Sequence, residues 1–164
     1  MELMVTIAVL AVVTAIAIPS YQIVQTRNAI RTFVNDYTAS IYFARSEAVR
    51  QNAQVTVCPS NNGTNCTDSQ LEAGWIVMVG AANAVAPPIL QDNLPRALIR
   101  TQFANNLLAD RAITFLPNGQ RRAVNPNELR VCPVAAGLGA QSRNIAIATT
   151  GRTQLTQPGA CQIP

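Results

Sequence analysis

The side chains that could do chemistry in this sequence are arginines, carboxylates and cysteines. All twelve basic residues are arginine, because the sequence contains no lysine and no histidine. This excludes nucleophiles paired with histidine, lysine Schiff bases, the lysine of a P-loop and histidine-ligated metals. Only carboxylate chemistry remains for an enzyme, and the nearest acidic pair, Asp68 and Glu72, fits a solvated loop. We therefore predict no catalytic residue, no metal and no cofactor.

The arginines are concentrated in the C-terminal half of the chain. From Arg96 onward, eight arginines stand against two acidic residues, a local charge of +6, whereas the preceding residues carry −2. This polarity favours a polyanionic partner, and the arginine fork donates two parallel hydrogen bonds to a phosphate. The alternative is a solvated face, or a face that pairs with neighbouring proteins. Because aromatic residues near the arginines are few, any nucleic-acid binding should be led by the backbone and independent of base sequence.

For four of these arginines, the neighbouring residues predict whether the side chain is exposed and which way it faces. Arg121 and Arg122 follow an Asn-Gly turn, so we expect both near an exposed tip. Arg152 follows Gly151 after the last expected strand, where glycine lets the backbone turn and the arginine project. Arg143 and Arg152 have opposite parity along the chain, so the two need not face the same way.

Four cysteines allow three disulfide pairings. Zinc is a poor alternative because the sequence has no Cys-x-x-Cys and no histidine. We favour Cys58–Cys66, which would close an Asn-Gly loop, and Cys132–Cys161, which would pin the C-terminal tail. Free buried thiols are the alternative, whereas a disulfide framework indicates an oxidising compartment.

The first element is an uncharged apolar run, Leu3–Ile18, preceded by Glu2. As a helix it would be about 24 Å long, somewhat short of a bilayer core of about 30 Å. It could be a buried core helix, a cleavable signal peptide with a site at Ala15-Ile16-Ala17, or a membrane segment whose beginning is missing. A signal peptide needs a positive N-terminal region, whereas Met1-Glu2 precedes the apolar run here, so this reading is disfavoured. A lone carboxylate at the edge of an apolar helix usually has a specific partner. Glu2 therefore favours the membrane segment.

After Pro19 the pattern becomes that of an amphipathic helix extending to about Asn52. Pro19 is expected to kink or break this helix. Steps of three and four residues define one apolar stripe, with charged residues off it. The stripe consists of Ile30, Phe33, Val34, Tyr37, Ile41, Ala44 and Ala48.

Beyond Asn52 the sequence changes to short alternating or β-branched runs separated by Asn, Gly and Pro. Pro87-Pro88 predicts a loop over residues 81–93. The fold class is α+β: a long N-terminal helix packed on a small antiparallel β-sheet domain. We divide the chain into a membrane and assembly segment (1–20), an amphipathic helix (21–52) and a β-rich domain (53–164). The expected strands are Ala53–Cys58, Gly74–Gly80, Ala97–Gln102, Arg111–Leu116, Glu128–Cys132 and Arg143–Thr150.

The N-terminal segment resembles that of type IV pilins. Glu2-Leu3-Met4-Val5-Thr6, the apolar run and Ile18-Pro19-Ser20-Tyr21 match the segment shared by that family. In pilins a leader ending in glycine is cut just before a Phe-Thr-Leu-Ile-Glu-Leu stretch. That leader is missing here, so we expect a truncated start. An ordered set of short motifs resembles the GspH/FimT-type minor pilins: Ala44–Val49, Val55–Ser60, Gly74–Val77, Ile113–Gly119 and Thr150–Arg152.

The resemblance implies a pilin-like fold whose first helix half is transmembrane. It implies that Glu2 pairs with the N-terminal amine of a neighbouring subunit, because low dielectric strengthens such a pair and penalises the unpaired charge. A glutamate that snorkels to the membrane edge is the alternative. The implied partners are major and minor pilins, the inner-membrane assembly machinery and, for the full-length precursor, prepilin peptidase. The implied location is a single pass of the inner membrane with a periplasmic domain, followed by incorporation into the pilus.

FimT-type proteins implicated in DNA uptake carry a Gly-Arg-x-Arg motif in their tail. Here the motif is Gly151-Arg152-Thr153-Gln154, so a neutral glutamine replaces the second arginine. We expect a minor pilin that initiates or caps a type IV pilus and binds double-stranded DNA non-specifically for natural transformation. The alternative is a GspH-type minor pseudopilin of the type II secretion system. The candidate DNA-binding residues are Arg152, Arg143, Arg121, Arg122, Gly151 and Gln154.

Overall fold

A computed structural model describes residues 2–84, 87–103, 111–123, 128–134, 141–156 and 161. The side chains of residues 15–20 are not described, so the small-residue site at Ala15-Ile16-Ala17 lies outside the described side chains. Met1 also lies outside the described residues.

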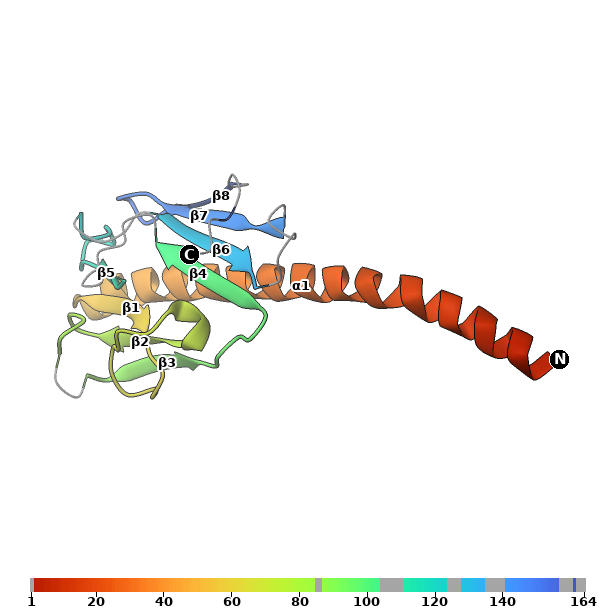
Figure 1. Ribbon diagram of the computed structural model, residues 1–164. Coiled ribbons are helices and arrows are strands. Elements are labelled where there is room, and N and C mark those ends of the chain that lie inside the picture. The colour runs from red at the N-terminus through yellow and green to blue at the C-terminus, as the bar shows by residue number, and fades with distance from the viewer. Residues whose placement is uncertain are drawn as a thin grey trace.

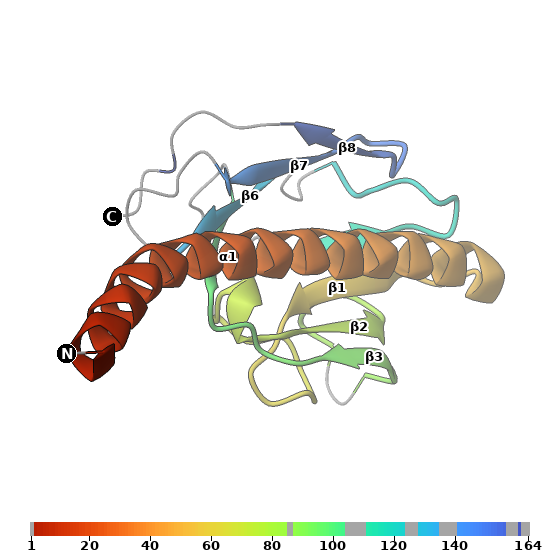
Figure 2. The same ribbon diagram turned by 90° about the vertical axis from the view of Figure 1, so that its right-hand side faces the viewer.

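The helix α1 (Glu2–Gln51) is 50 residues long and runs the length of the molecule (Figure 1). Its N-terminal part projects beyond the strands and bends away from the axis of the rest (Figure 2). The sequence predicts a kink or a break at Pro19. The break is wrong, because α1 continues through that position. A single proline removes one backbone donor, and a long helix accommodates that loss by bending. Within the described residues, no helix combines the length and apolar character needed to cross a membrane.

The second half of α1 buries the predicted apolar stripe. All seven residues from Ile30 to Ala48 in that stripe are at most 3% exposed. Phe33 and Tyr37 stack with ring centroids 5.9 Å apart, and Trp75 meets both rings edge-on at 5.2 and 5.7 Å. This aromatic cluster joins α1 to the β-domain.

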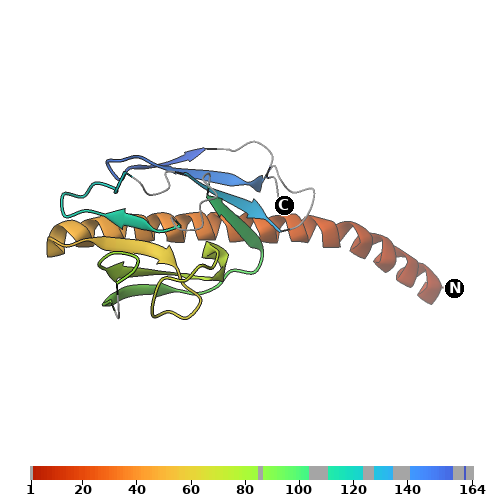
Figure 3. The ribbon, with the colours of Figure 1, turned by 60° about the vertical axis from the view of Figure 1, so that its left-hand side comes forward.

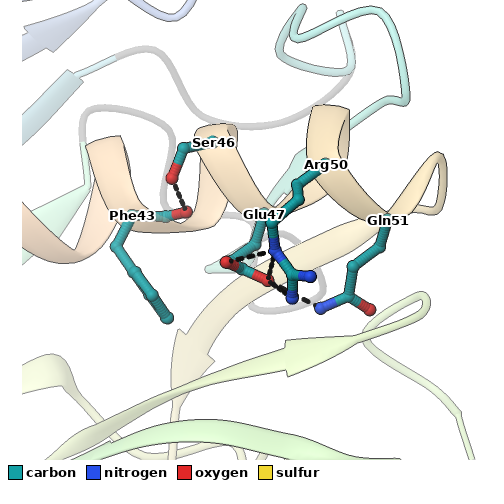
Figure 4. A network of polar contacts seen from close by, with 5 residues as sticks. All are labelled: Phe43, Ser46, Glu47, Arg50 and Gln51. Carbon is teal, nitrogen blue, oxygen red and sulfur yellow. Dashed lines mark hydrogen bonds and ion pairs between the residues drawn. The ribbon is translucent and has the colours of Figure 1, made fainter.

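Figure 4 shows the C-terminal turns of α1. Arg50 Nη2 and Gln51 Nε2 donate to Glu47 Oε2 at 2.6 and 2.7 Å. The hydrogen bond from Arg50 lowers the pKa of the Glu47 carboxyl below its usual range, with Gln51 adding to the effect. The helix then ends at Asn52, whose φ of 49° is the left-handed conformation that often follows a last helical turn.

Within the described residues, eight strands form two four-stranded sheets in which every neighbouring pair is antiparallel. The short helix η1 (Leu71–Ala73) precedes the second strand. Sheet A has the order β3-β2-β1-β5 and sheet B has the order β4-β6-β7-β8. Sheet A consists of β1 (Val55–Pro59), β2 (Trp75–Val79), β3 (Ile89–Asn93) and β5 (Ile113–Phe115). Sheet B consists of β4 (Ile99–Phe103), β6 (Glu128–Pro133), β7 (Arg143–Ile147) and β8 (Thr153–Thr156).

Both sheets contribute one face to a core against α1 (Figures 1 and 3). Val57 and Val77 of sheet A, and Val131 and Ile145 of sheet B, are fully buried in this core. The opposite face of sheet A has its own small apolar cluster, in which Cys58, Ile76 and Met78 are buried. The prediction of an α+β fold with a long helix on antiparallel strands is confirmed.

Two strands lie where the sequence analysis placed none. Residues 89–93, expected to be a loop, form β3 at the edge of sheet A, paired with β2. The two prolines precede this strand and leave its pairing intact. The strand expected at 143–150 ends at Ile147, and β8 follows it after a turn. The β3 segment lacks the β-branched pattern of the other strands and the β8 segment is only four residues long, so pairing with a neighbour decides the conformation of both.

Both cysteine pairs that the sequence analysis favoured are bonded in the structure. Cys58 of β1 bonds Cys66, with Cα atoms 5.5 Å apart, and holds the intervening loop over the outer face of sheet A. Cys132 of β6 bonds Cys161, with Cα atoms 6.0 Å apart, and attaches the tail to sheet B.

Candidate functional site

Arg122 and Arg152 lie at the end of the domain formed by the last turns of α1. The Arg121 amide donates to the Thr149 carbonyl oxygen at 2.7 Å, so residues 121–122 lie against the turn between β7 and β8. The Ala148 amide donates to the Arg152 carbonyl oxygen at 2.9 Å across that turn. Both Arg122 and Arg152 are exposed. We call this pair the arginine tip.

Arg121 does not belong to the exposed surface. Its residue is only 6% exposed, and its Nη1 donates to the Arg122 carbonyl oxygen at 3.2 Å. Burial lowers the pKa of the Arg121 guanidinium. The expectation of an exposed side chain is wrong here because Arg121 forms an antiparallel bridge with Phe115. Bridge partners share a face, and Phe115 faces the core.

Gly151 has a structural role beside the arginine tip. Its φ is 78°, and its amide donates to the Ala148 carbonyl oxygen at 2.8 Å to close the β7–β8 turn. A Cβ atom here would lie 2.9 Å from Cδ of Arg45 and 3.0 Å from Cε1 of Phe115. Only glycine fits both the backbone conformation and the close approach of α1. Gly151 therefore sets the position of Arg152.

Gln154 lies two residues after Arg152, exposed in β8 and opposite Ala146 of β7. It is therefore on the surface next to the arginine tip, in the place where the Gly-Arg-x-Arg pattern has its second arginine. A glutamine there offers a neutral donor, so the exposed charge next to it comes from Arg122 and Arg152, with Arg45 of α1 packed against Gly151.

Arg143 lies at the other end of β7, and the structure does not bring it to the arginine tip. At about 3.3 Å per residue, Arg143 is about 16 Å from Ala148, where the turn begins. Together with Arg27 and Arg31 of α1 it lines a cavity of about 240 Å³. We call these three residues the neck cluster. The parity argument concerned only the faces of Arg143 and Arg152, whereas the length of β7 separates them and packing places Arg143 against Arg27 and Arg31.

Several other charged residues are paired within the domain. Arg96 Nη2 lies 2.5 Å from Asp36 Oδ2, and Arg111 Nη1 lies 3.8 Å from Asp68 Oδ1. Glu72 Oε2 accepts from the Thr101 amide at 3.0 Å and also from the Thr101 hydroxyl, which ties η1 to β4. The acidic pair Asp68 and Glu72 thus holds loops in place. Among the described residues no group of three or more histidine, cysteine or acidic side chains could hold a metal ion.

Glu2 is exposed at the N-terminal end of α1. The described apolar residues that follow it, from Leu3 to Val13, are exposed as well (Figure 1). Glu2 therefore lies at the far end of the molecule from the arginine tip.

Comparison with known proteins gives the same fold. A crystal structure of the type IV minor pilin FimU of Pseudomonas aeruginosa PAO1 superposes with a TM-score of 0.60 at 25% identity, covering 83% of this chain and 97% of that chain. The minor pseudopilin EpsH from the type 2 secretion system of Vibrio cholerae superposes with a TM-score of 0.53 at 12% identity, covering 79% of this chain and 98% of that chain.

No curated protein sequence matches the chain. The family model of the type II transport protein GspH matches residues 34–151, which extend from the buried half of α1 to the β7–β8 turn. Because this match covers most of the chain and the fold agrees, the chain belongs to the GspH family, whose pilin fold is that of non-enzymatic structural proteins of pili and pseudopili.

Proposed function

We propose that this chain is a minor pilin of a type IV pilus, anchored in the inner membrane by residues 1–20 and built into the filament through α1. The observation that carries the proposal is the division of α1 into two halves. The second half buries its apolar stripe in the domain, whereas Leu3, Met4 and Val5 of the first half are 73%, 79% and 62% exposed. A continuous apolar helix surface of this length indicates burial in lipid or among other helices.

The identity to FimU, 25% against 12% for EpsH, supports the pilus over the secretion system. A GspH-type pseudopilin would use the same helix and the same fold. The test is the filament into which the chain is incorporated when it is produced in cells that carry both systems. Recovery in sheared pili supports the proposal, and recovery only with pseudopilus components contradicts it.

We infer that Glu2 pairs with the N-terminal amine of a neighbouring subunit during incorporation. An exposed carboxylate next to an apolar run gains most from an opposite charge when both enter a low-dielectric bundle. We expect Glu2→Gln to leave the domain folded and the membrane-bound amount unchanged, while the amount in sheared pili falls at least ten-fold.

Two matched variants sharpen the test of Glu2. Glu2→Asp keeps the charge and should retain part of the incorporation. Glu47→Gln removes a partly buried carboxylate, paired with Arg50 at the other end of α1, and should leave the incorporation unchanged. Incorporation of Glu2→Gln at the unmodified level would show that the charge has no part in assembly.

We infer a second activity, non-specific binding of double-stranded DNA by the arginine tip. Arg122 and Arg152 are exposed, come from two different loops and lie at the end of the domain farthest from Glu2. In a filament whose axis contains the N-terminal half of α1, this end remains accessible. Guanidinium groups are suited to phosphate. An exposed aromatic residue lies beside Arg152, since the Tyr42 hydroxyl is 2.8 Å from Thr153 Oγ1.

The experiment for DNA binding is a salt titration of a duplex against the oxidised protein. We expect the log of the affinity to fall linearly with the log of the salt concentration, at about 0.9 per phosphate contacted. Arg122→Gln and Arg152→Gln should each lower the slope by about one. Arg100→Gln, which removes an exposed charge at the start of β4, is the control and should leave the slope unchanged. Absence of binding at low salt would mean that the positive end is only a solvated face.

A further inference from the structure

The neck cluster is a concentration of positive charge that the assembly and DNA proposals do not use. Arg27 and Arg31 lie one helical turn apart on α1, and Arg143 faces them from the start of β7. Two cavities of about 240 and 430 Å³ share Arg31 and Arg143 in their linings. None of the described residues that line either cavity is acidic. Three like charges facing one cavity repel each other until an anion enters.

The hydrogen bonds within the neck cluster leave most guanidinium donors available. Arg27 Nε donates to Gln141 Oε1 at 2.7 Å, and Arg143 Nη1 donates to the Ser142 carbonyl oxygen at 2.8 Å. Within the described residues no ion pair involves Arg27, Arg31 or Arg143. Each guanidinium carries five N–H donors, so the cluster can bind a phosphate in a bidentate manner.

The lining of the larger cavity indicates an amphiphilic ligand. Beside Arg31 and Arg143 it contains the apolar side chains of Val34 and Leu155 and the polar groups of Asn35 and Thr156. Leu155 is 55% exposed at this position. An inorganic ion would gain nothing from these apolar side chains, whereas a phospholipid presents a phosphate joined to an apolar body.

The neck cluster also lies beyond the expected membrane segment, on the side of the domain. Arg27 follows Ile18, the end of the apolar run, by about 13 Å along the helix, and Arg31 is about 6 Å farther on. The polar layer of a bilayer extends about 5–8 Å beyond its hydrocarbon core. Helical side chains lean toward the N-terminus, so the Arg27 side chain reaches back toward that layer, and Arg31 lies one turn farther from it. Tyr21, which is 64% exposed, lies between the run and the cluster, where interfacial aromatic residues are typical.

We propose that the neck cluster binds the phosphate of an anionic phospholipid headgroup while the subunit is anchored in the membrane. The site orients the domain on the bilayer before the subunit enters the filament. This proposal rests on the proposed anchoring by residues 1–20. Incorporation would then exchange the headgroup for contacts with other subunits.

The experiment measures co-flotation of the full chain with vesicles of phosphatidylcholine alone or mixed with phosphatidylglycerol. The chain should prefer the vesicles that contain phosphatidylglycerol. Arg31→Gln and Arg143→Gln should each reduce that preference about five-fold, the effect expected for one basic residue near an anionic surface. Arg50→Gln is the matched control: it removes the same charge about 28 Å farther along α1 and should not change the preference.

The outcomes separate the two proposals. Equal binding of the full chain and its variants to both kinds of vesicle would overturn the headgroup site and leave the anchoring intact. Binding to neither kind of vesicle would overturn the anchoring, and the headgroup site with it. Loss of the preference on adding inorganic phosphate at constant ionic strength would indicate a site for the free ion and overturn the lipid assignment. A loss of duplex affinity in Arg143→Gln equal to that in Arg152→Gln would assign the cluster to DNA instead.

Discussion

At the scale of single residues, Gly151 links the β7–β8 turn to α1. We expect Gly151→Ala to destabilise the domain by about 2–4 kcal/mol, since it combines left-handed strain with overpacking against Arg45 and Phe115. Unfolding in denaturant measures this loss. Arg152→Ala, one residue along and exposed, should change the free energy of unfolding by less than about 0.5 kcal/mol. A stable Gly151→Ala would mean that the turn relaxes away from α1.

Tyr37, whose hydroxyl is buried, is a second residue for which the structure predicts the sign of a stability change. Within the described part of the chain this hydroxyl has no hydrogen-bond partner, and burial raises the pKa of Tyr37 far above its usual range. Because an unsatisfied buried polar group costs about 1–3 kcal/mol, Tyr37→Phe should be neutral or stabilising. Ser40→Ala should do the opposite, since Trp75 Nε1 donates to Ser40 Oγ at 3.0 Å and would lose its acceptor. Thermal unfolding of the two variants tests both signs, and a strongly destabilised Tyr37→Phe would contradict this reasoning.

At the scale of elements, the two disulfides constrain different parts of the fold. In the chain-entropy relation, closing loops with separations of 8 and 29 residues stabilises by about 2.5 and about 3.6 kcal/mol. Replacing Cys132 and Cys161 together by serine should therefore lower the free energy of unfolding more than replacing Cys58 and Cys66, as far as the entropy of the unfolded chain decides it. Replacing Cys58 and Cys66 should additionally loosen the small cluster on the outer face of sheet A. Denaturant unfolding gives the free energy of unfolding of each double variant. If both variants are as stable as the unmodified protein, a structural role of the disulfides is excluded.

At the scale of the whole molecule, the two halves of α1 have different roles: the second half belongs to the folded domain and the first half is available for assembly. Every described side chain before Tyr21 is exposed, and the first buried residue is Thr26. A chain that begins at Tyr21 should therefore unfold at the same temperature as the full chain and remain monomeric, whereas the full chain should self-associate in water. Calorimetry and analytical ultracentrifugation check the two halves of this prediction. A lower unfolding temperature for the shorter chain would show that the projecting half supports the domain.

The sequence by itself determined the features that depend on local periodicity. The stripe from Ile30 to Ala48 predicts the buried face of α1, because a 3.6-residue period places those side chains on one side whatever they contact. The change to short alternating runs after Asn52 predicts the strands of both sheets except β3 and β8. The favoured cysteine pairs also follow from loop closure along the chain.

Only the tertiary structure decided which distant residues come together. The strands β3 and β8 exist because β2 and β7 offer edges to them, and no local pattern contains that partner. Arg121 turns inward because of its bridge to Phe115. Arg143 joins Arg27 and Arg31 because β7 packs across α1. The loop that carries Arg122 lies against the β7–β8 turn because the Arg121 amide donates to the Thr149 carbonyl oxygen. Local propensity acts over a few residues, whereas these contacts join residues far apart in the chain and depend on how the two sheets pack on one helix.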